Sequence, residues 1–339
     1  MDELVIGADL GGTSTRLTVA TTAGSRPATV EGAGGNPTTH GVERAAAELS
    51  SAARRALSGL DPAAVAAVVI GVAGRATLDD KRAADIFAGA LAAAGVTARP
   101  VFVGDAEVAF CSATPAPDGT VLLAGTGAMA VRIRDRRTTT TSDGLGWLLG
   151  DEGSAYWLGR EAVRAAIAAI GGTGPATTLV EAVSARLLDT APGEVLDEGS
   201  AGSVQRRRSA LIRAVAARPP IQLAALAPLV VEAEAAGDAV AAAICDDAAA
   251  RLVRLVGDVR GPAEADPLVL NGGVVRAQDA PVGRRVRRLI AERFAGEVLT
   301  AADGIAGAAW LAVRDIRPQW SGERLAQVHA LLTAPAPRH

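Results

Sequence analysis

Sulfur and aromatic side chains are scarce in this chain of 339 residues, which holds two cysteines, two methionines and 3% aromatic residues. Cys111 and Cys245 are far apart in the sequence and form no Cys-x-x-Cys pair. This spacing argues against a shared metal or redox site and favours buried, reduced thiols. Hydrophobic residues make up 49% of the chain, mostly Ala, Val and Leu, which excludes disorder and leaves room for two domains of ordinary size.

Lysine is almost absent, because Lys81 is the single one, and the formal net charge is −3. That balance provides no basic field for a polyanion, so we expect no nucleic-acid partner. The arginine clusters at 206–208 and 284–288 are expected to be solvated helix faces.

Long apolar runs are also missing. The most apolar stretch, Ala63–Gly74, is well short of the roughly 20 residues that a membrane span needs. Asp2 and Glu3 precede the first apolar segment, where a secretory signal would carry positive charge. We therefore expect a cytoplasmic protein with no membrane partner.

The most informative stretch present is Asp9-Leu10-Gly11-Gly12-Thr13-Ser14-Thr15, which follows a short apolar strand. Glycines let backbone N–H groups approach an anion, Asp9 can hold a metal directly or through water, and Thr13 and Thr15 can donate to phosphate oxygens. No Lys-Ser/Thr follows and the third glycine of a dinucleotide loop is missing, so neither common Gly-rich fingerprint applies. A plain β-hairpin turn is the structural alternative.

Strand-like and helix-like runs alternate through the first third of the chain. We expect strands at Leu4–Ile6, Leu17–Ala20, Val65–Val72 and Val101–Val103, and helices at Val42–Leu57 and Asp79–Ala94. Such alternation predicts a mostly parallel sheet covered by helices.

A second glycine turn, Gly125-Thr126-Gly127, lies between the predicted strands Thr120–Ala124 and Ala128–Ile133. Its likeness to the first turn predicts two related halves that face one cleft and grip one triphosphate. Beyond it we expect a further strand and mostly helices: Ser154–Ile170, Ser200–Gly237 with a break at Pro219-Pro220, Ala239–Gly257, strand Leu268–Leu270, and a helix starting at Asp303–Ala308. The expected domains are 1–117 and 118–313, with a C-terminal helix at about 314–332 packed on the first.

Six motifs occur in an order that resembles the sugar kinases of the actin, hexokinase and Hsp70 superfamily, in particular the N-acetylglucosamine kinase and BadF/BadG/BcrA/BcrD ATPase family. They are Asp9–Thr13, Gly34-Gly35-Asn36, Gly104-Asp105-Ala106, Gly125–Gly127, Gly150–Trp157 and Asn271-Gly272-Gly273. The resemblance covers nearly the whole chain. It implies an α/β fold of two ribonuclease H-like domains around a central cleft, and a homodimer.

The resemblance also implies an ATP- and Mg²⁺-dependent transfer of phosphate to the 6-hydroxyl of an amino sugar, with N-acetylglucosamine as the first expectation. Asp105 would be the general base; its alternative is an N-cap for a helix at Ala106–Ser112. Asp9 would hold Mg²⁺ through water. The phosphates would be oriented by backbone and hydroxyl groups of Gly11, Gly12, Thr13, Thr15, Gly125, Thr126 and Gly127.

For the other motifs a structural alternative stands beside each implied role. Gly272, Gly273 and Gly307 would pass close to adenine and ribose, or serve packing. Asn36 would bind the sugar together with Gly127, or form a turn. Asp151 would contact the sugar or support its loop, while Glu152 and Ser154 would cap the following helix.

Two departures concern the acceptor: Met129 and Gly104 stand where similar kinases often carry Asn. Glucosamine, another hexose and N-acetylmuramic acid therefore remain alternatives. An activator ATPase of 2-hydroxyacyl-CoA dehydratases is disfavoured because it needs clustered cysteines. A catalytically inactive sugar sensor remains the non-enzyme alternative; the first strand begins at Leu4, which leaves no room for a preceding DNA-binding domain.

Overall fold

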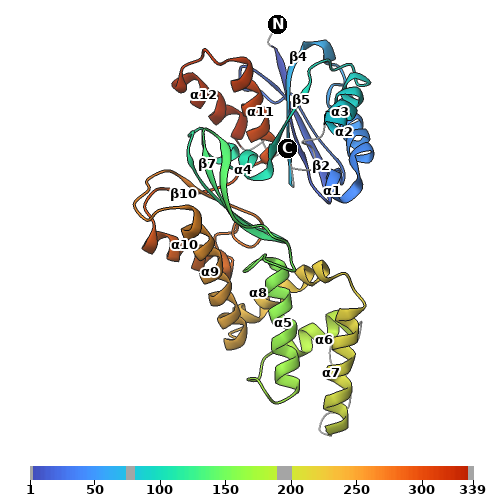
Figure 1. Cartoon of the computed structure of the whole chain (residues 1–339), viewed down its shortest axis with the longest axis vertical. Coiled ribbons are helices and arrows are strands. Elements are labelled where there is room, and N and C mark those ends of the chain that lie inside the picture. The colour runs from blue at the N-terminus through green and yellow to red at the C-terminus, as the bar shows by residue number, and fades with distance from the viewer. Residues whose placement is uncertain (1–2, 74–80, 189–200, 335–339) are drawn as a thin grey trace. The chain divides into compact units, whose positions relative to one another are not determined.

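The computed structural model describes residues 3–73, 81–188 and 201–334 (Figure 1). Contacts divide the chain into two units. Unit 1 comprises residues 1–119, 133–138 and 299–339, and unit 2 comprises 120–132 and 139–298. Across the described residues no one helix has the length and composition to cross a membrane; Gly202–Ala216 and Pro220–Ala235 meet that test only jointly, as a pair bent by 116°.

Unit 1 is built on a five-stranded sheet in the order β3-β2-β1-β4-β5. Its strands are β1 (Leu4–Leu10), β2 (Ser14–Thr21), β3 (Ala28–Ala33), β4 (Val65–Val72) and β5 (Pro100–Gly104). β1 pairs antiparallel with β2 and β2 with β3, whereas β1–β4 and β4–β5 are parallel. The expectation of a mostly parallel sheet is therefore wrong, because the first glycine turn folds the chain back into a hairpin and β3 extends it.

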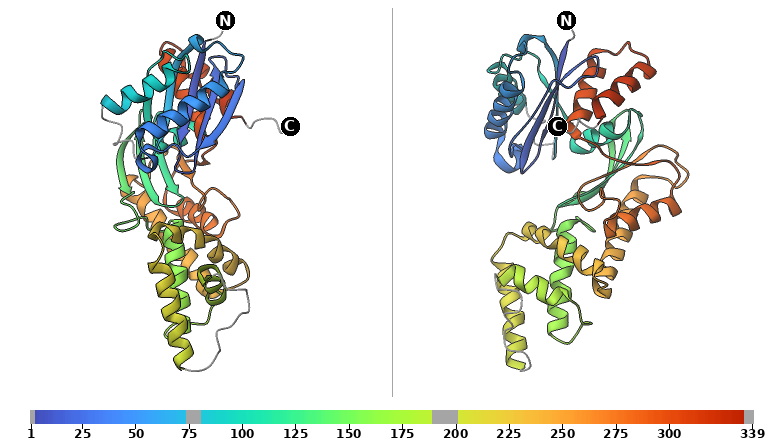
Figure 2. Two further views of the ribbon diagram at one scale, coloured as in Figure 1. Left: turned by 90° about the vertical axis from the view of Figure 1, so that its right-hand side faces the viewer. Right: turned by 180° about the vertical axis from the view of Figure 1, so that it is seen from behind.

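The helices of unit 1 cover both faces of this sheet (Figures 1 and 2). They are α1 (Pro37–His40), α2 (Val42–Ala56), α3 (Lys81–Ala92), α4 (Asp105–Ala113), α11 (Gly304–Ile316) and α12 (Gly322–Thr333), with a 3₁₀ turn η1 (Pro62–Ala64). On one face, α2 and α3 bury Leu49 and Phe87 against Ile6, Leu17 and Ile70 of the strands. The predicted helix at 42–57 and strand at 65–72 are confirmed; residues 79 and 80 of the predicted helix at 79–94 lie outside the described residues.

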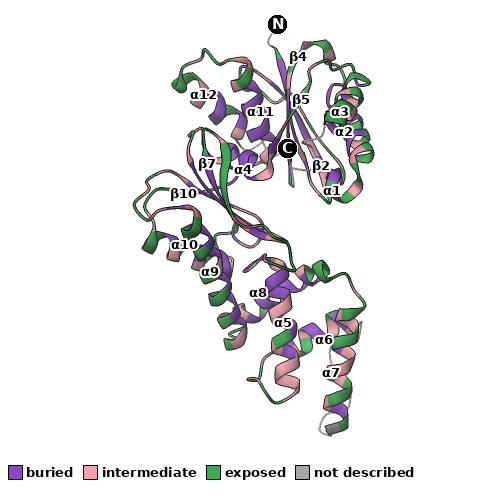
Figure 3. Cartoon of the chain, viewed as in Figure 1, coloured by how far each residue is buried: buried purple, intermediate pink, exposed green. Residues whose placement is uncertain are grey.

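On the opposite face, α11 packs along β1, β4 and α4. Nine consecutive residues of α11, Ile305–Val313, are buried, and Figure 3 shows this helix and β1 coloured as buried. Such contacts assign residues 299–313 to unit 1, whereas the sequence-based boundary placed them with the second domain. The helix expected at about 314–332 is in fact the end of α11 followed by α12.

Unit 2 contributes to a second five-stranded sheet, in the order β10-β9-β6-β7-β8. The strands are β6 (Gly119–Ala124), β7 (Ala128–Arg134), β8 (Arg137–Asp143), β9 (Leu268–Asn271) and β10 (Val298–Thr300). β6 and β9 run parallel. Two residues connect β7 to β8, a length that joins only antiparallel strands, so this sheet is mixed as well.

Helices pack around this sheet and one another. They are α5 (Ala155–Ile170), α6 (Leu179–Leu188), α7 (Ala201–Ala216), the 3₁₀ segment η3 (Pro220–Leu226), α8 (Ala227–Ala235), α9 (Ala239–Val259) and α10 (Pro281–Arg293). The core gathers Trp157 and Leu158 of α5 with Leu252 and Val256 of α9 and Leu270 of β9. The predicted break at Pro219-Pro220 is confirmed.

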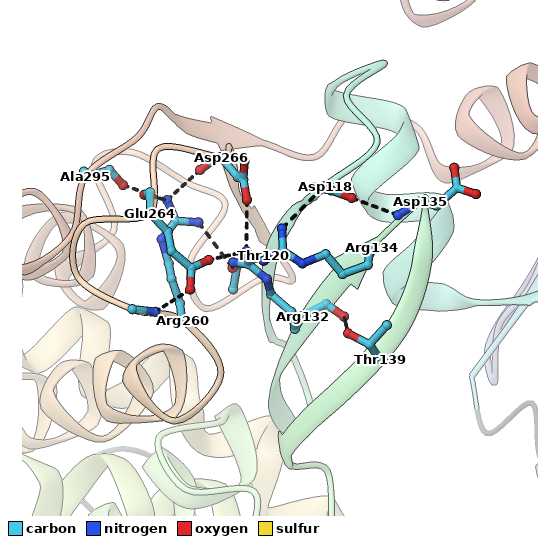
Figure 4. A network of polar contacts seen from close by, with 11 residues as sticks. Asp118, Thr120, Arg132, Arg134, Asp135, Thr139, Arg260, Glu264, Asp266 and Ala295 are labelled. Carbon is cyan, nitrogen blue, oxygen red and sulfur yellow. Dashed lines mark hydrogen bonds and ion pairs between the residues drawn. The ribbon is translucent and has the colours of Figure 1, made fainter.

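Two buried arginines anchor the strands of unit 2 (Figure 4). Arg132 and Arg260, only 5% and 3% exposed, each donate to the hydroxyl of Thr120, at 3.3 Å. The Arg260 Nη2 also donates to the backbone carbonyls of Glu264, Asp266 and Ala295. Since Thr120 lies near the start of β6 and Asp266 precedes β9, the network fixes the beginnings of two parallel strands whose far ends carry the glycine turns.

Candidate active site

Asp9 lies in strand β1 rather than in the turn after it. It pairs in register with Arg16 of β2 on one side and with Gly71 of β4 on the other. The first turn of α11 passes close by, because a Cβ atom on Gly304 would lie 3.4 Å from the Asp9 Oδ2. The carboxylate is therefore half-buried at the carboxyl end of a central strand, where α/β sheets place ligands.

The pKa of Asp9 is raised to about 6, first by burial and then by the nearby charge of Asp105; Arg16 lowers this pKa and Asp303 raises it. Asp303 caps α11 and is itself held by Arg16 at 2.9 Å and Arg26 at 3.1 Å. Acidic groups thus outweigh basic ones around Asp9. Such a site favours the uptake of a proton or a cation.

A magnesium ion at Asp9 would not sit in a cage of protein ligands. Among residues 3–73, 81–188 and 201–334, no three His, Cys, Asp or Glu side chains are arranged to hold a metal ion. Mg²⁺ keeps several of its waters and is commonly bound by one or two carboxylates together with substrate phosphates. The lone, negatively biased carboxylate of Asp9 fits that second mode.

Asp105 is the first residue of α4, directly after β5. The alternative that it caps this helix is wrong, because the capping position belongs to Gly104. One of its oxygens accepts from the Ala106 N–H at 2.9 Å. Burial raises the pKa of Asp105, and the charge of Glu107 raises it too, although the N–H groups of Ala106 and of Asp105 itself lower it. A carboxylate with a raised pKa is better matched to accepting a proton near neutral pH.

The first glycine turn forms a β-hairpin, which is its structural alternative, and contact with phosphate stays a prediction. The Gly11 N–H donates to the Ser14 carbonyl at 2.9 Å, which closes the β1–β2 hairpin. Gly12 and Thr13 are exposed at its tip, and a Cβ atom on Gly12 would come no closer than 3.9 Å to a neighbour. His40 of α1, not identified from the sequence, lies with its Nε2 2.7 Å from the Gly12 carbonyl.

Thr15 does not join that exposed tip. The residue is fully buried, and a Cβ atom on Gly35 would lie 2.2 Å from its hydroxyl oxygen. Within the described part of the chain this hydroxyl has no hydrogen-bond partner. The expectation that Thr15 donates to phosphate is therefore corrected, because the first residues of β2 alternate between the two faces of the sheet and Thr15 points inward.

Asn36 is buried and caps α1. Its Oδ1 accepts from the Thr38 N–H at 2.8 Å, and its Nδ2 donates to the Ala73 carbonyl at 3.2 Å. The side chain thus ties the glycine loop of residues 34–36 to the segment after β4. This geometry matches the turn-forming alternative, and contact with sugar stays a prediction.

The second glycine turn lies in unit 2, before α5. The carbonyls of Gly125 and Thr126 accept from Ala155 and Tyr156 at the start of that helix. Asp151 is buried behind the turn and accepts from the Ala128 N–H at 3.0 Å. A Cβ atom on Gly127 would lie 2.5 Å from the Asp151 Oδ1, so only glycine fits there.

Asp151 thus supports the glycine turn, as one of its two predicted roles requires. Burial raises the pKa of Asp151, the bond from Ala128 lowers it, and Asp143 raises it. Ser154 caps α5 through the Trp157 N–H, as predicted. Glu152 forms ion pairs with Arg160 and Arg251 rather than capping the helix.

A largely apolar cavity of about 590 Å³ opens beside the second glycine turn, within unit 2. Its volume falls in the range of small-molecule sites, about 300–1,000 Å³. It is lined by Gly125, Thr126, Ala155, Leu158, Ala224, Ala227, Pro228, Val231, Glu232, Gly273, Val274, Ala280 and Val282. Three of these residues, Gly125, Thr126 and Gly273, belong to the predicted nucleotide set.

Gly272 and Gly307 act in packing. Gly272 has φ +98°, and a Cβ atom there would lie 2.3 Å from the Ala124 carbonyl oxygen. A Cβ atom on Gly307 would lie 2.3 Å from the Val108 carbonyl oxygen, where α11 crosses α4 in unit 1. Gly307 does not line the cavity of unit 2, and its contact matches the packing alternative.

An exposed apolar loop, residues 143–152, was missed from the sequence. Asp143 closes it by accepting from the N–H groups of Asp151 at 2.8 Å and Glu152 at 3.1 Å. Leu145, Leu148 and Leu149 are 63%, 74% and 75% exposed at its tip. A Cβ atom on Gly144 would lie 3.3 Å from that of Met129, so this loop adjoins the residue that departs from the family pattern.

The two mixed sheets, each flanked by helices, make this an α/β protein, as predicted. The fold is shared with a solved candidate N-acetylglucosamine kinase from Chromobacterium violaceum, which superposes with a TM-score of 0.68 over 92% of this chain and 99% of that one at 23% identity.

The chain belongs to the BadF/BadG/BcrA/BcrD ATPase family, whose model matches residues 6–312. It is similar to an N-acetylmuramic acid/N-acetylglucosamine kinase of Clostridium acetobutylicum, at 30% identity over 33% of this chain and 36% of the relative. It is also similar to an N-acetyl-D-glucosamine kinase of Dictyostelium discoideum, at 28% identity over 62% of this chain and 64% of the relative. The chain thus matches less than two thirds of the length of either relative.

Proposed function

We propose that the protein is an ATP-dependent sugar kinase that phosphorylates the 6-hydroxyl of an amino sugar, with N-acetylglucosamine as the first candidate. The observation that carries this proposal is the placement of Asp105. Its half-buried carboxylate follows a parallel strand, does not occupy the capping position of α4, and interacts with the half-buried Asp9. The kinase names of the two curated relatives support the same reaction class.

Asp105 accepts the proton of the sugar hydroxyl as that oxygen attacks the γ-phosphoryl group. Its raised pKa suits this step, because the protonated product is stabilised relative to an ordinary aspartate. Phosphoryl transfer otherwise needs positioning and neutralisation of charge. Mg²⁺ held through water at Asp9 would neutralise the phosphate oxygens, and the exposed backbone N–H groups of Gly12 and Thr13 would orient them.

The nucleoside occupies the apolar cavity of unit 2, with its phosphates toward Gly125 and Thr126. Apolar walls and an exposed glycine turn at one end suit a flat base with a charged tail. The family's description as ATPases supports ATP as the nucleotide.

The acceptor is read by Asn36 and by the turn that Asp151 supports. Met129 lacks the hydrogen bonds of an amide, so glucosamine, another hexose and N-acetylmuramic acid are the alternatives to N-acetylglucosamine. A sugar sensor without activity is disfavoured because Asp9, Asp105 and both glycine turns are all present. An activator ATPase is disfavoured because Cys111 and Cys245 are both buried and far apart in the sequence. The proposal includes a cytoplasmic location and a homodimer.

A coupled ADP-release assay against a panel of amino sugars and hexoses tests this function. We expect sugar-dependent ADP release in the presence of Mg²⁺, and phosphorus-coupled NMR of the product showing phosphate on O6. Release of ADP that no sugar accelerates, or phosphate on the anomeric oxygen, would contradict the proposal.

A further inference from the structure

Glu107 is a buried carboxylate to which the proposed reaction assigns no role. It is 5% exposed in the first turn of α4, two residues after Asp105. Burying a charged carboxylate is costly unless hydrogen bonds compensate it. Its contacts therefore indicate what it contributes.

Both oxygens of Glu107 accept backbone N–H groups from different segments of unit 1. One accepts from the N–H of Gly104 at 3.1 Å, which holds the Val103–Gly104 peptide at the end of β5, one residue before Asp105. The other accepts from Thr138 in β8 at 2.9 Å. Arg137 approaches at 3.5 Å, with half of its side chain exposed.

These contacts act on Asp105 through its backbone. The bond from the Gly104 N–H to Glu107 is one half of a capping box, and Gly104 has no side chain to form the other half. The second bond prevents Glu107 from turning away, because the same carboxylate is tied to β8. A shift of the Val103–Gly104 peptide relative to α4 would move Gly104 and the Asp105 carboxylate after it, and a displacement of 1 Å can cost about a hundredfold in rate.

We propose that Glu107 is a positioning residue for Asp105: it holds the Val103–Gly104 peptide at the end of β5, and through Gly104 the carboxylate that follows, in the orientation that receives the proton. This inference rests on the proposed kinase function. The sequence contains a signal for it, since Glu three residues after a capping position is typical of a capping box.

The shape-matched variant Glu107→Gln tests the inference. An amide has one oxygen where the carboxylate has two, so its NH₂ group must face one of the two N–H donors. We expect kcat to fall about tenfold with the KM for sugar and for MgATP within twofold. Glu107→Met, which keeps the volume and removes both acceptors, is expected to lower kcat further. Rates are divided by the MgATP-binding stoichiometry from calorimetry, so that misfolded protein does not count.

A double-mutant cycle separates positioning from other roles. If Glu107 acts through Asp105, then adding Glu107→Gln to Asp105→Asn lowers kcat by less than twofold. Arg137→Gln is the matched control, because it removes the ion pair and leaves both N–H bonds, and we expect its kcat within twofold of wild type.

Three results would overturn the inference. They are a kcat for Glu107→Gln within twofold of wild type, a full tenfold fall in kcat when Glu107→Gln is added to Asp105→Asn, or a rise in KM with kcat unchanged. A different result bears on the proposed function. If Asp105→Asn itself retains the wild-type rate, the assignment of the base fails, whatever Glu107 does.

Discussion

Replacing Asp9 by asparagine is expected to stabilise the protein near neutral pH while it removes activity. The pKa of Asp9 in the folded protein is about 6, against 3.8 for an unperturbed aspartate, because burial and neighbouring carboxylates disfavour its charge. The folded chain therefore holds this proton more tightly than the unfolded chain. Between those two values the free energy of unfolding falls as the pH rises, and at pH 7 the whole penalty is in place.

The size of the effect follows from the pKa difference of about two units, which corresponds to about 3 kcal/mol. The asparagine amide cannot ionise, so the variant avoids that penalty at pH 7, whereas near pH 4 both proteins are neutral at this position. For a unit of 150–250 residues, about 3 kcal/mol corresponds to a rise in Tm of about 6–12 °C. An aspartate in an exposed turn would show no such gain.

Thermal unfolding of wild type and Asp9→Asn from pH 4 to 7, without nucleotide or Mg²⁺, measures the effect. The exposed Asp85, paired with the exposed Arg99, provides the control Asp85→Asn, for which we expect a stability difference below about 1 kcal/mol. A stability difference for Asp9→Asn that stays flat between pH 4 and 7, or a variant less stable than wild type at pH 7, would refute the electrostatic reasoning. Activity measured with Mg²⁺ should fall despite the higher Tm.

Three further substitutions test other parts of the account. Val231→Trp should fill the cavity of unit 2 and raise the KM for MgATP at least tenfold with little change in the KM for sugar. A KM for MgATP equal to that of wild type would show that the nucleoside binds elsewhere. Arg260→Met should lower the free energy of unfolding by about 3–5 kcal/mol in urea, because three carbonyls and the Thr120 hydroxyl lose a buried donor. The half-exposed Arg134→Gln should cost less than about 1 kcal/mol. Met129→Asn should raise the ratio of kcat/KM for N-acetylglucosamine to that for glucosamine about three- to tenfold, which corresponds to one hydrogen bond of about 0.5–1.5 kcal/mol. An unchanged ratio would show that Met129 takes no part in acceptor recognition.

Elements with strong periodicity and clear ends were predictable from the sequence. The β-branched run at 65–72 and the amphipathic segment after Gly41 were located to within a residue, and Ser154 was identified as a cap. These features depend on local preferences that a chain segment carries by itself. Asp105 was located for the same reason, because it directly follows an apolar strand.

Features that depend on distant packing could not be predicted. Gly307 looks like a ligand-binding glycine in the sequence, yet it is required where α11 crosses α4. Thr15 follows a turn that resembles a phosphate-binding loop but points into the core. Strand β8 holds four threonines and lacks an apolar face, because most of it is exposed. Glu107 was overlooked because one of its two partners, Thr138, is 31 residues away in the sequence.

The central claim, that Asp105 is the general base of a sugar kinase, is tested most directly by the turnover of Asp105→Asn. With binding of MgATP and sugar verified by calorimetry, the account predicts that kcat for ADP release with the best sugar falls by ~10²–10⁴, the scale of a positioned general base, while both dissociation constants stay within about threefold. A variant that binds both ligands and turns over within about threefold of wild type would contradict the claim.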